Sequence, residues 1–278
     1  MPDHVPAAAS SPTNPSEARV RRPLVVLDQV GKTYSNGTVA VREVDLTIGE
    51  HEFLSLLGPS GCGKSTVLRM IAGLGDITTG SIDWPASPVD GSGRPDREVG
   101  FVFQEPTLMP WATVFDNVYL PLKLRGRPKA AVRDQVMDAL EMVHLETFAT
   151  AYPRELSGGM KMRVSIARAL VTEPKVLLMD EPFAALDEIT RFKLNNDLLA
   201  LWEERSFTVI FVTHSVYESV YLSNRIVVMA ARPGRVIADI AVDAVYPRTE
   251  AFRTSSVYNE HCRQVSGELR AAMGGDEH

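Results

Sequence analysis

Short apolar runs alternate with longer segments in which apolar residues recur at helical spacing. Three of the runs, His51–Leu57, Val176–Met179 and Phe207–Thr213, have the length and composition of buried strands. Val67–Ala72 and Glu188–Glu204 follow two of these runs and have the pattern of helices. This alternation of strands and helices predicts an α/β fold.

The part of the chain before the first of these runs has a pattern of its own. Three short strands are expected there: Leu24–Val30, Val39–Val41 and Val44–Ile48. A loop at Gly31–Gly37 separates the first strand from the second, and a turn separates the second from the third. The pattern predicts an antiparallel β layer that leads into the strand His51–Leu57. Gly80–Trp84 is a further strand, and a loop rich in Pro, Gly and Asp follows at Pro85–Arg97.

A helical insertion is predicted at about residues 105–172, after the strand Glu98–Phe103. Thr113 is placed to cap a helix, and Asp116 lies in the first turn, where a negative charge is favourable. Pro128–Val143 has apolar residues at helical spacing. We therefore expect an α-helical subdomain between two strand-rich parts of the chain.

The composition is that of an ordinary globular protein of 278 residues, 45% hydrophobic and 23% charged. The net charge of −6 gives no support to a nucleic-acid partner. The two cysteines, Cys62 and Cys262, are too few for a disulfide framework or a cysteine metal cluster and suit a reducing compartment. No apolar run approaches the roughly 18 residues that would span a bilayer, so attachment to a membrane would need a partner.

The two ends of the chain are expected to lie outside the main domain at 24–245. Residues 1–23 are rich in Pro, Ala and Ser, which predicts a disordered tail. They lack the basic start and apolar core of a secretory signal. Residues 246–278 are expected to form a short, polar and helical C-terminal extension.

The clearest chemistry lies in the segment Gly58–Thr66, GPSGCGKST, which fits the phosphate-binding pattern G-x-x-x-x-G-K-[ST] between a strand and a helix. Glycines allow successive N–H groups to point at an anion, and the following helix adds its positive end. Lys64 would supply a charge for the β- and γ-phosphates, and the Ser65 hydroxyl would bind Mg²⁺. The predicted nucleotide contacts of this phosphate loop are Gly58, Ser60, Gly61, Cys62, Gly63, Lys64, Ser65 and Thr66.

Four more polar side chains stand at the ends of predicted strands. Asp180 occupies the position of a second carboxylate associated with Mg²⁺, and the adjacent Glu181 could accept a proton from the attacking water or orient it. Gln104 could contact both Mg²⁺ and that water, and His214 could bind the γ-phosphate. Alone, a Gln or a His after a strand would carry no such meaning; their order relative to the phosphate loop makes them candidates.

Two further elements are candidates for nucleotide contacts. Ser157, Gly158 and Gly159 form a turn of small residues before a helix, where N–H groups can bind an anion. A second phosphate-binding element is redundant in one monomer and makes sense if it completes the site of another copy. Tyr34 could stack on an adenine ring, or it could be a partly buried loop tyrosine.

Together these motifs resemble the ATP-binding subunit of an ABC transporter over about Leu24–Ala241. The resemblance rests on GPSGCGKST, Gln104, LSGGM, VLLMDEP, AALD and His214, all in the expected order. It implies a RecA-like P-loop NTPase core, an antiparallel β subdomain and an inserted α-helical subdomain. The sequence departs from the common pattern at Met160, where Gln is usual, and at Ala184 and Ala185, where Ser is frequent.

The resemblance also implies an assembly. Two copies would face head to tail and enclose two ATP, with Ser157 and Gly159 of one copy at the γ-phosphate held by Lys64 of the other. Asp187 would lie at the seam of this homodimer. Binding of ATP would close the dimer, and hydrolysis through Glu181 would reopen it.

Gln104–Trp111, Glu181–Arg191 and the motif RPGR resemble the nitrate/sulfonate/taurine group of ABC importers. This implies permease subunits, indirectly a solute-binding protein, and a place at the cytoplasmic face of the inner membrane. Leu108 and Trp111 are candidates for the permease contact, or they pack inside the helical subdomain. Importers of bicarbonate or of pyrimidine and thiamine precursors remain alternatives for the cargo.

Three other classes fit the motifs less well. Soluble ABC ATPases that act on DNA or ribosomes usually have two ATPase units or a long coiled-coil insertion, whereas this chain has one phosphate loop. Exporter ATPases are often fused to a permease, and no apolar run here is long enough to span a membrane. A regulator that binds ATP without hydrolysis would not need Glu181, Gln104 and His214.

Overall fold

The computed structural model describes residues 21–85, 87, 97–205 and 207–274. Most of the tail predicted at 1–23, and most of the loop predicted at Pro85–Arg97, lie outside these residues. The last residue of the predicted tail, Pro23, already belongs to a strand, where it pairs with Gly49.

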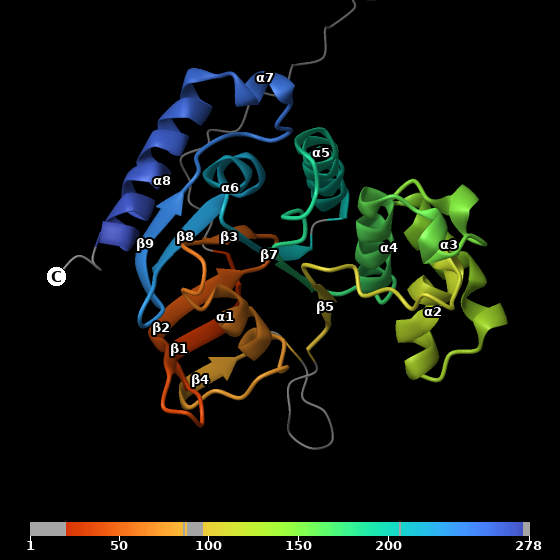
Figure 1. Cartoon of the computed structure of the whole chain (residues 1–278), viewed down its shortest axis with the longest axis horizontal. Coiled ribbons are helices and arrows are strands. Elements are labelled where there is room, and N and C mark those ends of the chain that lie inside the picture. Colours follow the sequence, from red (N-terminus) through yellow and green to blue (C-terminus); the bar gives the residue numbers. More distant parts are fainter. Residues whose placement is uncertain (1–20, 86, 88–96, 206, 275–278) are drawn as a thin grey trace, which may run out of the picture.

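The main sheet has six strands in the order β5-β6-β7-β3-β8-β9 (Figure 1). Their bounds are β3 Phe53–Leu57, β5 Val99–Val102, β6 Val176–Asp180, β7 Thr208–Thr213, β8 Arg225–Ala230 and β9 Arg235–Ala241. The first five strands of this order are parallel, and β9 is antiparallel to β8. In a parallel sheet all carboxyl ends lie at one edge, and this edge carries the predicted catalytic residues Gln104, Glu181 and His214.

A smaller antiparallel sheet of three strands has the order β2-β1-β4, which confirms the predicted β layer. Its strands are β1 Pro23–Thr33, β2 Val39–Gly49 and β4 Thr79–Asp83. The predicted turn inside β2 was wrong. The strand is continuous because Glu43, with a φ of 48°, absorbs an irregularity in the pairing with β1. The loop predicted from Gly31 was also wrong at its start, because β1 continues to Thr33.

Helices cover both faces of the main sheet (Figure 1). They are α1 Lys64–Ile71, α5 Glu188–Arg205, α6 Val216–Leu222 and α8 Ser256–Gly274, and the short helix α7 Glu250–Arg253 precedes α8. Alternate residues of β6 serve two cores: Val176 and Leu178 pack with α1 and the antiparallel sheet, whereas Leu177 and Met179 pack with α5 and α6. The continuous apolar run at β6 thus follows from burial on both faces.

The helical insertion lies beyond β5 at one side of the main sheet (Figure 1). It contains α2 Val114–Leu124, α3 Arg133–Glu141 and α4 Gly158–Leu170. Thr113 caps α2 as predicted, since its Oγ1 accepts from the Asp116 N–H at 3.1 Å. The helix predicted over Pro128–Val143 is instead a 3-10 turn at Lys129–Val132 followed by α3, because Val132 has a non-helical φ of −122°.

The C-terminal helices are not purely polar. Tyr258, Cys262 and Val265 of α8 are buried in the same core as α6 and β8. The guanidinium of Arg248, itself buried, donates to backbone carbonyls at the end of α6, including Tyr221 at 3.0 Å. None of the helices in the described ranges is long and apolar enough to cross a membrane.

Candidate nucleotide-binding site

The phosphate loop, Gly58–Thr66, leads from the carboxyl end of β3 into α1. Gly63, the residue before the helix, has a φ of +92°, which an L side chain rarely adopts. A Cβ at Gly58 would lie 2.5 Å from the Met229 carbonyl oxygen of the neighbouring strand. These positions therefore require glycine for conformation and for space.

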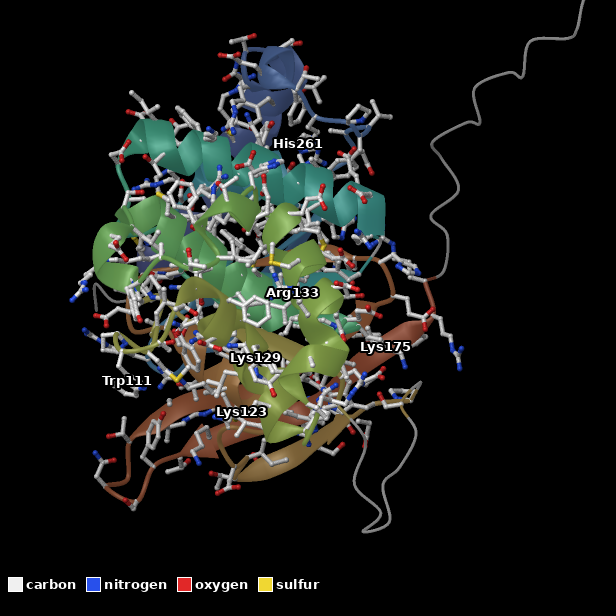
Figure 2. The ribbon with its side chains drawn as sticks, turned by 90° about the vertical axis from the view of Figure 1, so that its right-hand side faces the viewer. Trp111, Lys123, Lys129, Arg133, Lys175 and His261 are labelled. Carbon is white, nitrogen blue, oxygen red and sulfur yellow. The ribbon has the colours of Figure 1, made fainter. Side chains whose placement is uncertain are left out.

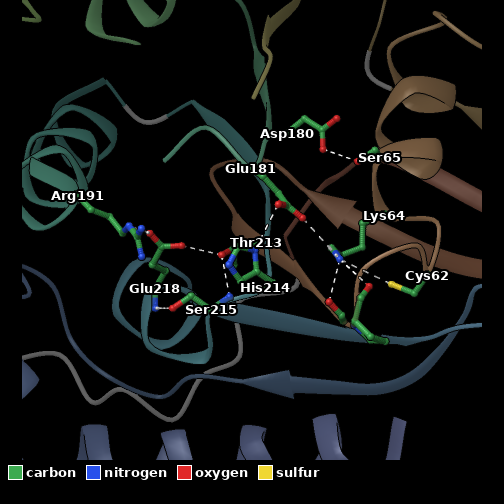
Figure 3. Close-up of polar contacts among 12 residues, drawn as sticks. Cys62, Lys64, Ser65, Asp180, Glu181, Arg191, Thr213, His214, Ser215 and Glu218 are labelled. Atoms are coloured by element: carbon green, nitrogen blue, oxygen red, sulfur yellow. Dashed lines mark hydrogen bonds and ion pairs between the residues drawn. The ribbon is translucent and has the colours of Figure 1, made fainter. Parts of the chain in front are cut away.

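Lys64 lies across the loop rather than pointing into solvent, and only 4% of it is exposed. Its Nζ donates to the carbonyl oxygens of Gly58 at 2.8 Å and Pro59 at 3.0 Å. The same atom lies 3.8 Å from Glu181 Oε1 (Figure 3). The predicted phosphate-binding charge is thus held between the loop and the predicted catalytic carboxylate.

The side chain of Cys62 faces the protein interior. It is fully buried, and its Sγ lies 3.9 Å from Lys64 Nζ. Burial raises the pKa of the Cys62 thiol, against the opposing charge of Lys64. A protonated, buried thiol matches the interpretation of Cys62 as a small residue of the loop without redox chemistry.

Ser65 and Asp180 form the predicted pair. Ser65 Oγ donates to Asp180 Oδ1 at 2.6 Å (Figure 3), so the hydroxyl after the phosphate loop meets the carboxylate at the end of β6. A hydroxyl beside a carboxylate supplies the hard oxygen ligands that Mg²⁺ prefers. The donor set of Ser65 and Asp180 therefore fits this ion.

Glu181 meets His214 at the carboxyl ends of β6 and β7. Its Oε2 lies 3.3 Å from His214 Nδ1 (Figure 3). Glu181 has a φ of 46°, unusual for a residue other than glycine, and its N–H donates to the Val212 carbonyl at 3.1 Å. This backbone turn directs the side chain toward Lys64 and His214, which are both predicted phosphate contacts.

Gln104 and Tyr34 lie at the margins of this group. Gln104 is exposed and follows β5, which pairs with β6, so it belongs to the same sheet edge as Asp180. The Tyr34 hydroxyl lies 3.5 Å from Thr66 Oγ1, and 45% of the residue is exposed. The ring is thus beside the end of the phosphate loop and open on its surface, while adenine stacking itself stays a prediction.

Ser157, Gly158 and Gly159 lie elsewhere, at the start of α4 in the helical subdomain. Ser157 caps this helix, since its Oγ accepts from the Met160 N–H at 3.3 Å. A Cβ at Gly159 would come within 2.7 Å of Thr190 Cγ2, so the turn packs closely on the start of α5. The predicted nucleotide contacts thus form two groups, one around Lys64 and one around Ser157.

Asp187 belongs to the second group and also caps α5. Its Oδ1 accepts from the Thr190 N–H at 2.9 Å, and this hydrogen bond lowers the pKa of the exposed Asp187 carboxyl. Leu186 lies beside Gly158, because a Cβ there would be 3.5 Å from Leu186 Cδ2. The segment Ala184–Asp187 and the turn before α4 are therefore neighbours within one chain.

The two candidates for a permease contact differ in burial. Leu108 packs against the main hydrophobic core, whereas 77% of Trp111 is exposed, on the face shown in Figure 2. The buried side chain of Asn117 holds this loop by bonding both the N–H and the carbonyl of Met109. Leu108 therefore takes the alternative packing role, and Trp111 remains a surface candidate.

Sequence reasoning missed a hydrogen-bonded group around His214. Ser215 caps α6, with its Oγ accepting from the Glu218 N–H at 3.3 Å, and Glu218 in turn accepts from Thr213 Oγ1 at 2.7 Å. The spacing S-x-x-E at Ser215–Glu218 is a capping-box pattern, so the sequence did contain a signal for it. Arg191 also belongs to this group, because its Nε lies 3.8 Å from Glu218 Oε1, but no sequence pattern predicted this contact.

A glycine-rich loop before a helix, a lysine within it, and acidic and histidine side chains at neighbouring strand ends define a P-loop ATPase. The chain matches the ABC transporter family over residues 41–184. It therefore belongs to the ABC transporter family, whose ATP-binding subunits hydrolyse ATP to drive transport.

Curated relatives share most of the chain. An uncharacterised ABC transporter ATP-binding protein of Methanocaldococcus jannaschii is 46% identical over 88% of this chain and 89% of its own length. An aliphatic sulfonates import ATP-binding protein of Bacillus licheniformis is 47% identical over 84% of this chain and 88% of its own length.

Solved structures agree in fold. A component of an ABC transporter complex from Clostridium perfringens has a TM-score of 0.70 at 30% identity, covering 78% of this chain and 88% of that one. A dimeric ATP-binding cassette in a post-hydrolysis state, bound to ADP and Pi, has a TM-score of 0.68 at 36% identity, covering 80% of this chain and all of that one. The predicted RecA-like α/β fold and the ATP-binding function are thus confirmed.

Proposed function

We propose that the chain is the ATP-hydrolysing subunit of an importer for aliphatic sulfonates or a chemically similar small solute. The strongest support for the cargo is the 47% identity to an aliphatic sulfonates import ATP-binding protein. The strongest support for hydrolysis is the position of the Glu181 carboxylate, 3.8 Å from Lys64 and 3.3 Å from His214.

The residues around Lys64 would carry out the hydrolysis. The phosphate loop and Lys64 would hold the β- and γ-phosphates, and His214 would bind the γ-phosphate from the opposite side. Glu181, between them, would orient the attacking water and accept its proton. Ser65 and Asp180 would hold Mg²⁺, which, when bound, neutralises charge on the phosphates.

Gln104 and Tyr34 would complete the site from its margins. Gln104 would contact Mg²⁺ and the attacking water from the end of β5, where the helical subdomain begins. The exposed ring of Tyr34, next to Thr66, would stack on the adenine.

A second copy of the chain would supply the rest of each site. Ser157, Gly158 and Gly159 would bind the γ-phosphate held by Lys64 of the other copy, and Asp187 would lie at the seam. Their position at the start of α4, in a different subdomain from the phosphate loop, supports this role. Dimeric structures of similar cassettes at 36% and 35% identity support the same assembly.

Permease subunits would hold this homodimer at the cytoplasmic face of the inner membrane, and a solute-binding protein would deliver the cargo to them. Trp111 would contact the permease, because a large apolar side chain exposed on a loop is typical of interfaces. In this role the chain itself would not bind the cargo.

The cargo can be tested in proteoliposomes that contain the cognate permease, this subunit and the solute-binding protein. We expect ATP hydrolysis to rise with alkanesulfonates or taurine. Stimulation by nitrate, bicarbonate or a pyrimidine precursor, without stimulation by sulfonates, would contradict the sulfonate proposal while leaving the ATPase role intact.

A further inference from the structure

Glu218 is a nearly buried carboxylate on α6, 9% exposed, behind the predicted phosphate contact His214. Its Oε2 accepts from Thr213 Oγ1 at 2.7 Å, and Thr213 Oγ1 accepts from the Ser215 N–H at 3.0 Å (Figure 3). Thr213 and Ser215 are the residues on either side of His214. The Glu218 carboxylate therefore fixes the backbone from which the His214 side chain projects.

The other carboxylate oxygen of Glu218 faces Arg191 on α5. Glu218 Oε1 and Arg191 Nε lie 3.8 Å apart, and both atoms are buried without a hydrogen-bond partner among the described residues. Figure 3 shows the two side chains pointing toward each other. A hydrogen bond between these atoms would need an approach of roughly 0.9 Å, to the usual 2.9 Å.

Arg191 also holds the segment that precedes α5. Its NH2 group donates to the Leu186 carbonyl at 2.8 Å, and its backbone N–H donates to the Asp187 carbonyl at 2.9 Å. A continuous series of polar contacts thus runs from the backbone at His214, through Glu218 and Arg191, to Leu186. It joins the nucleotide side of one chain to the segment proposed to meet a second copy.

Arg191 Nε and Glu218 Oε1 are buried polar atoms that face each other without a hydrogen bond, which is unfavourable, and a hydrogen bond between them would remove part of that cost. We propose that Arg191 and Glu218 are positioning residues for ATP hydrolysis, which join into a hydrogen-bonded ion pair when a second copy docks on the Asp187 segment. The closed pair then holds His214 in place at the γ-phosphate. This inference rests on the proposed nucleotide-sandwich dimer and adds a link between its two sites.

This link, the Arg191–Glu218 contact, predicts different effects on KM and kcat when it is broken. The phosphate loop would make most of the contacts to ATP, and neither Arg191 nor Glu218 contacts this loop, so the KM for ATP should stay nearly unchanged. Turnover requires His214 in place, so kcat should fall. Cooperativity between the two sites of the dimer should also fall, because each site senses the other copy through Arg191.

Glu218→Gln tests the link, since the amide keeps the shape of the side chain and removes its charge. We expect about a tenfold lower kcat, a KM within about twofold of the parent value, and a Hill coefficient closer to one. Asp197→Asn is the matched control, because Asp197 on α5 is also a carboxylate in a helix–helix ion pair, with Arg163 of α4. An equal loss of kcat in Asp197→Asn, or a raised KM with unchanged kcat in Glu218→Gln, would overturn the proposal.

Arg191→Met provides an independent variant if Glu218→Gln does not fold, because the Arg191 side chain is 30% exposed and less central to packing. In the double variant, kcat should fall no further than in the more impaired single variant, since both act through one contact. Multiplied losses would contradict the link. Glu181→Gln in the same assay separates the two proposals. If both Glu181→Gln and Glu218→Gln keep the parent turnover, the proposed hydrolytic site is wrong. If Glu181→Gln loses turnover and Glu218→Gln keeps it, only the proposed role of the Arg191–Glu218 contact is wrong.

Discussion

Glu181 and His214 approach to 3.3 Å between Oε2 and Nδ1, although each comes from the end of a different strand (Figure 3). The other carboxylate oxygen of Glu181 lies 3.8 Å from Lys64 Nζ. A single carboxylate therefore links three strand ends, β3 through the phosphate loop, β6 and β7. This geometry supports the proposal that Glu181 acts on the attacking water.

Lys64→Ala should abolish ATP binding, because it removes the charge that the phosphate loop holds for the β- and γ-phosphates. Binding of a fluorescent ATP analogue would measure the loss, which we expect to exceed about a hundredfold in Kd. Lys175→Ala, which removes an exposed lysine paired with Glu98, is the control and should bind normally. Unchanged affinity in Lys64→Ala would exclude the loop as the phosphate site.

Glu181→Gln should retain ATP binding and lose hydrolysis by at least about a hundredfold, since the amide cannot accept a proton. The variant should then accumulate as an ATP-bound dimer, detectable by size-exclusion chromatography with light scattering. Glu141→Gln, an exposed α3 substitution, should behave like the parent. A monomeric Glu181→Gln protein that still hydrolyses ATP would show that another group is the base.

Trp111→Ala should weaken the coupling of hydrolysis to the permease and leave the basal ATPase rate of the isolated subunit within about twofold. The measurement compares solute-stimulated and basal rates in proteoliposomes. Leu124→Ala is a matched control, because Leu124 is an equally exposed apolar residue, at 79%, at the end of α2 in the same subdomain. Equal loss of basal and stimulated rates in Trp111→Ala would instead indicate a role in folding.

Arg248→Met should destabilise the fold by about 3 kcal/mol, because several carbonyls at the end of α6 and one directly after β9 lose their buried donor. Urea unfolding would measure the change. Arg253→Met removes a less buried arginine that stacks on Tyr221 and should cost about 1 kcal/mol or less. Equal effects of the two variants would contradict the anchoring role of Arg248.

Cys62 should be slow to alkylate at neutral pH, because burial raises the pKa of its thiol. The folded chain binds this proton more tightly than the unfolded chain. The Cys62 thiol therefore contributes fully to the free energy of unfolding at a pH below the thiol pKa of the unfolded chain. This contribution is lost as the pH rises through the higher pKa of the folded chain. Iodoacetamide labelling followed by mass spectrometry across a pH series would measure the rate at which Cys62 is alkylated, with glutathione as the free-thiol reference. Labelling at the glutathione rate would contradict it.

The sequence by itself determined the elements with strong local signals. The apolar run of β6 predicted a buried strand because it packs on both faces, and Thr113 predicted the start of α2 because a cap is a local contact. The phosphate loop could be predicted because the backbone conformation requires its glycines and the phosphates require its lysine, all within one short segment.

Predictions that depended on partners elsewhere in the chain were less accurate. The turn expected within β2 was wrong because pairing with β1 carries the strand through Glu43. The helix expected over Pro128–Val143 begins late, since Val132 departs from helical geometry.

Only the tertiary structure decided which side chains meet. Parallel strand ends far apart in sequence share one edge of the sheet, and this places Ser65 against Asp180 and Glu181 against His214. The packing of α5 on α6 likewise brings Arg191 to Glu218. These contacts cannot be predicted from the local sequence, because they depend on the order of the strands in the sheet and on which charged side chains the folded core buries together.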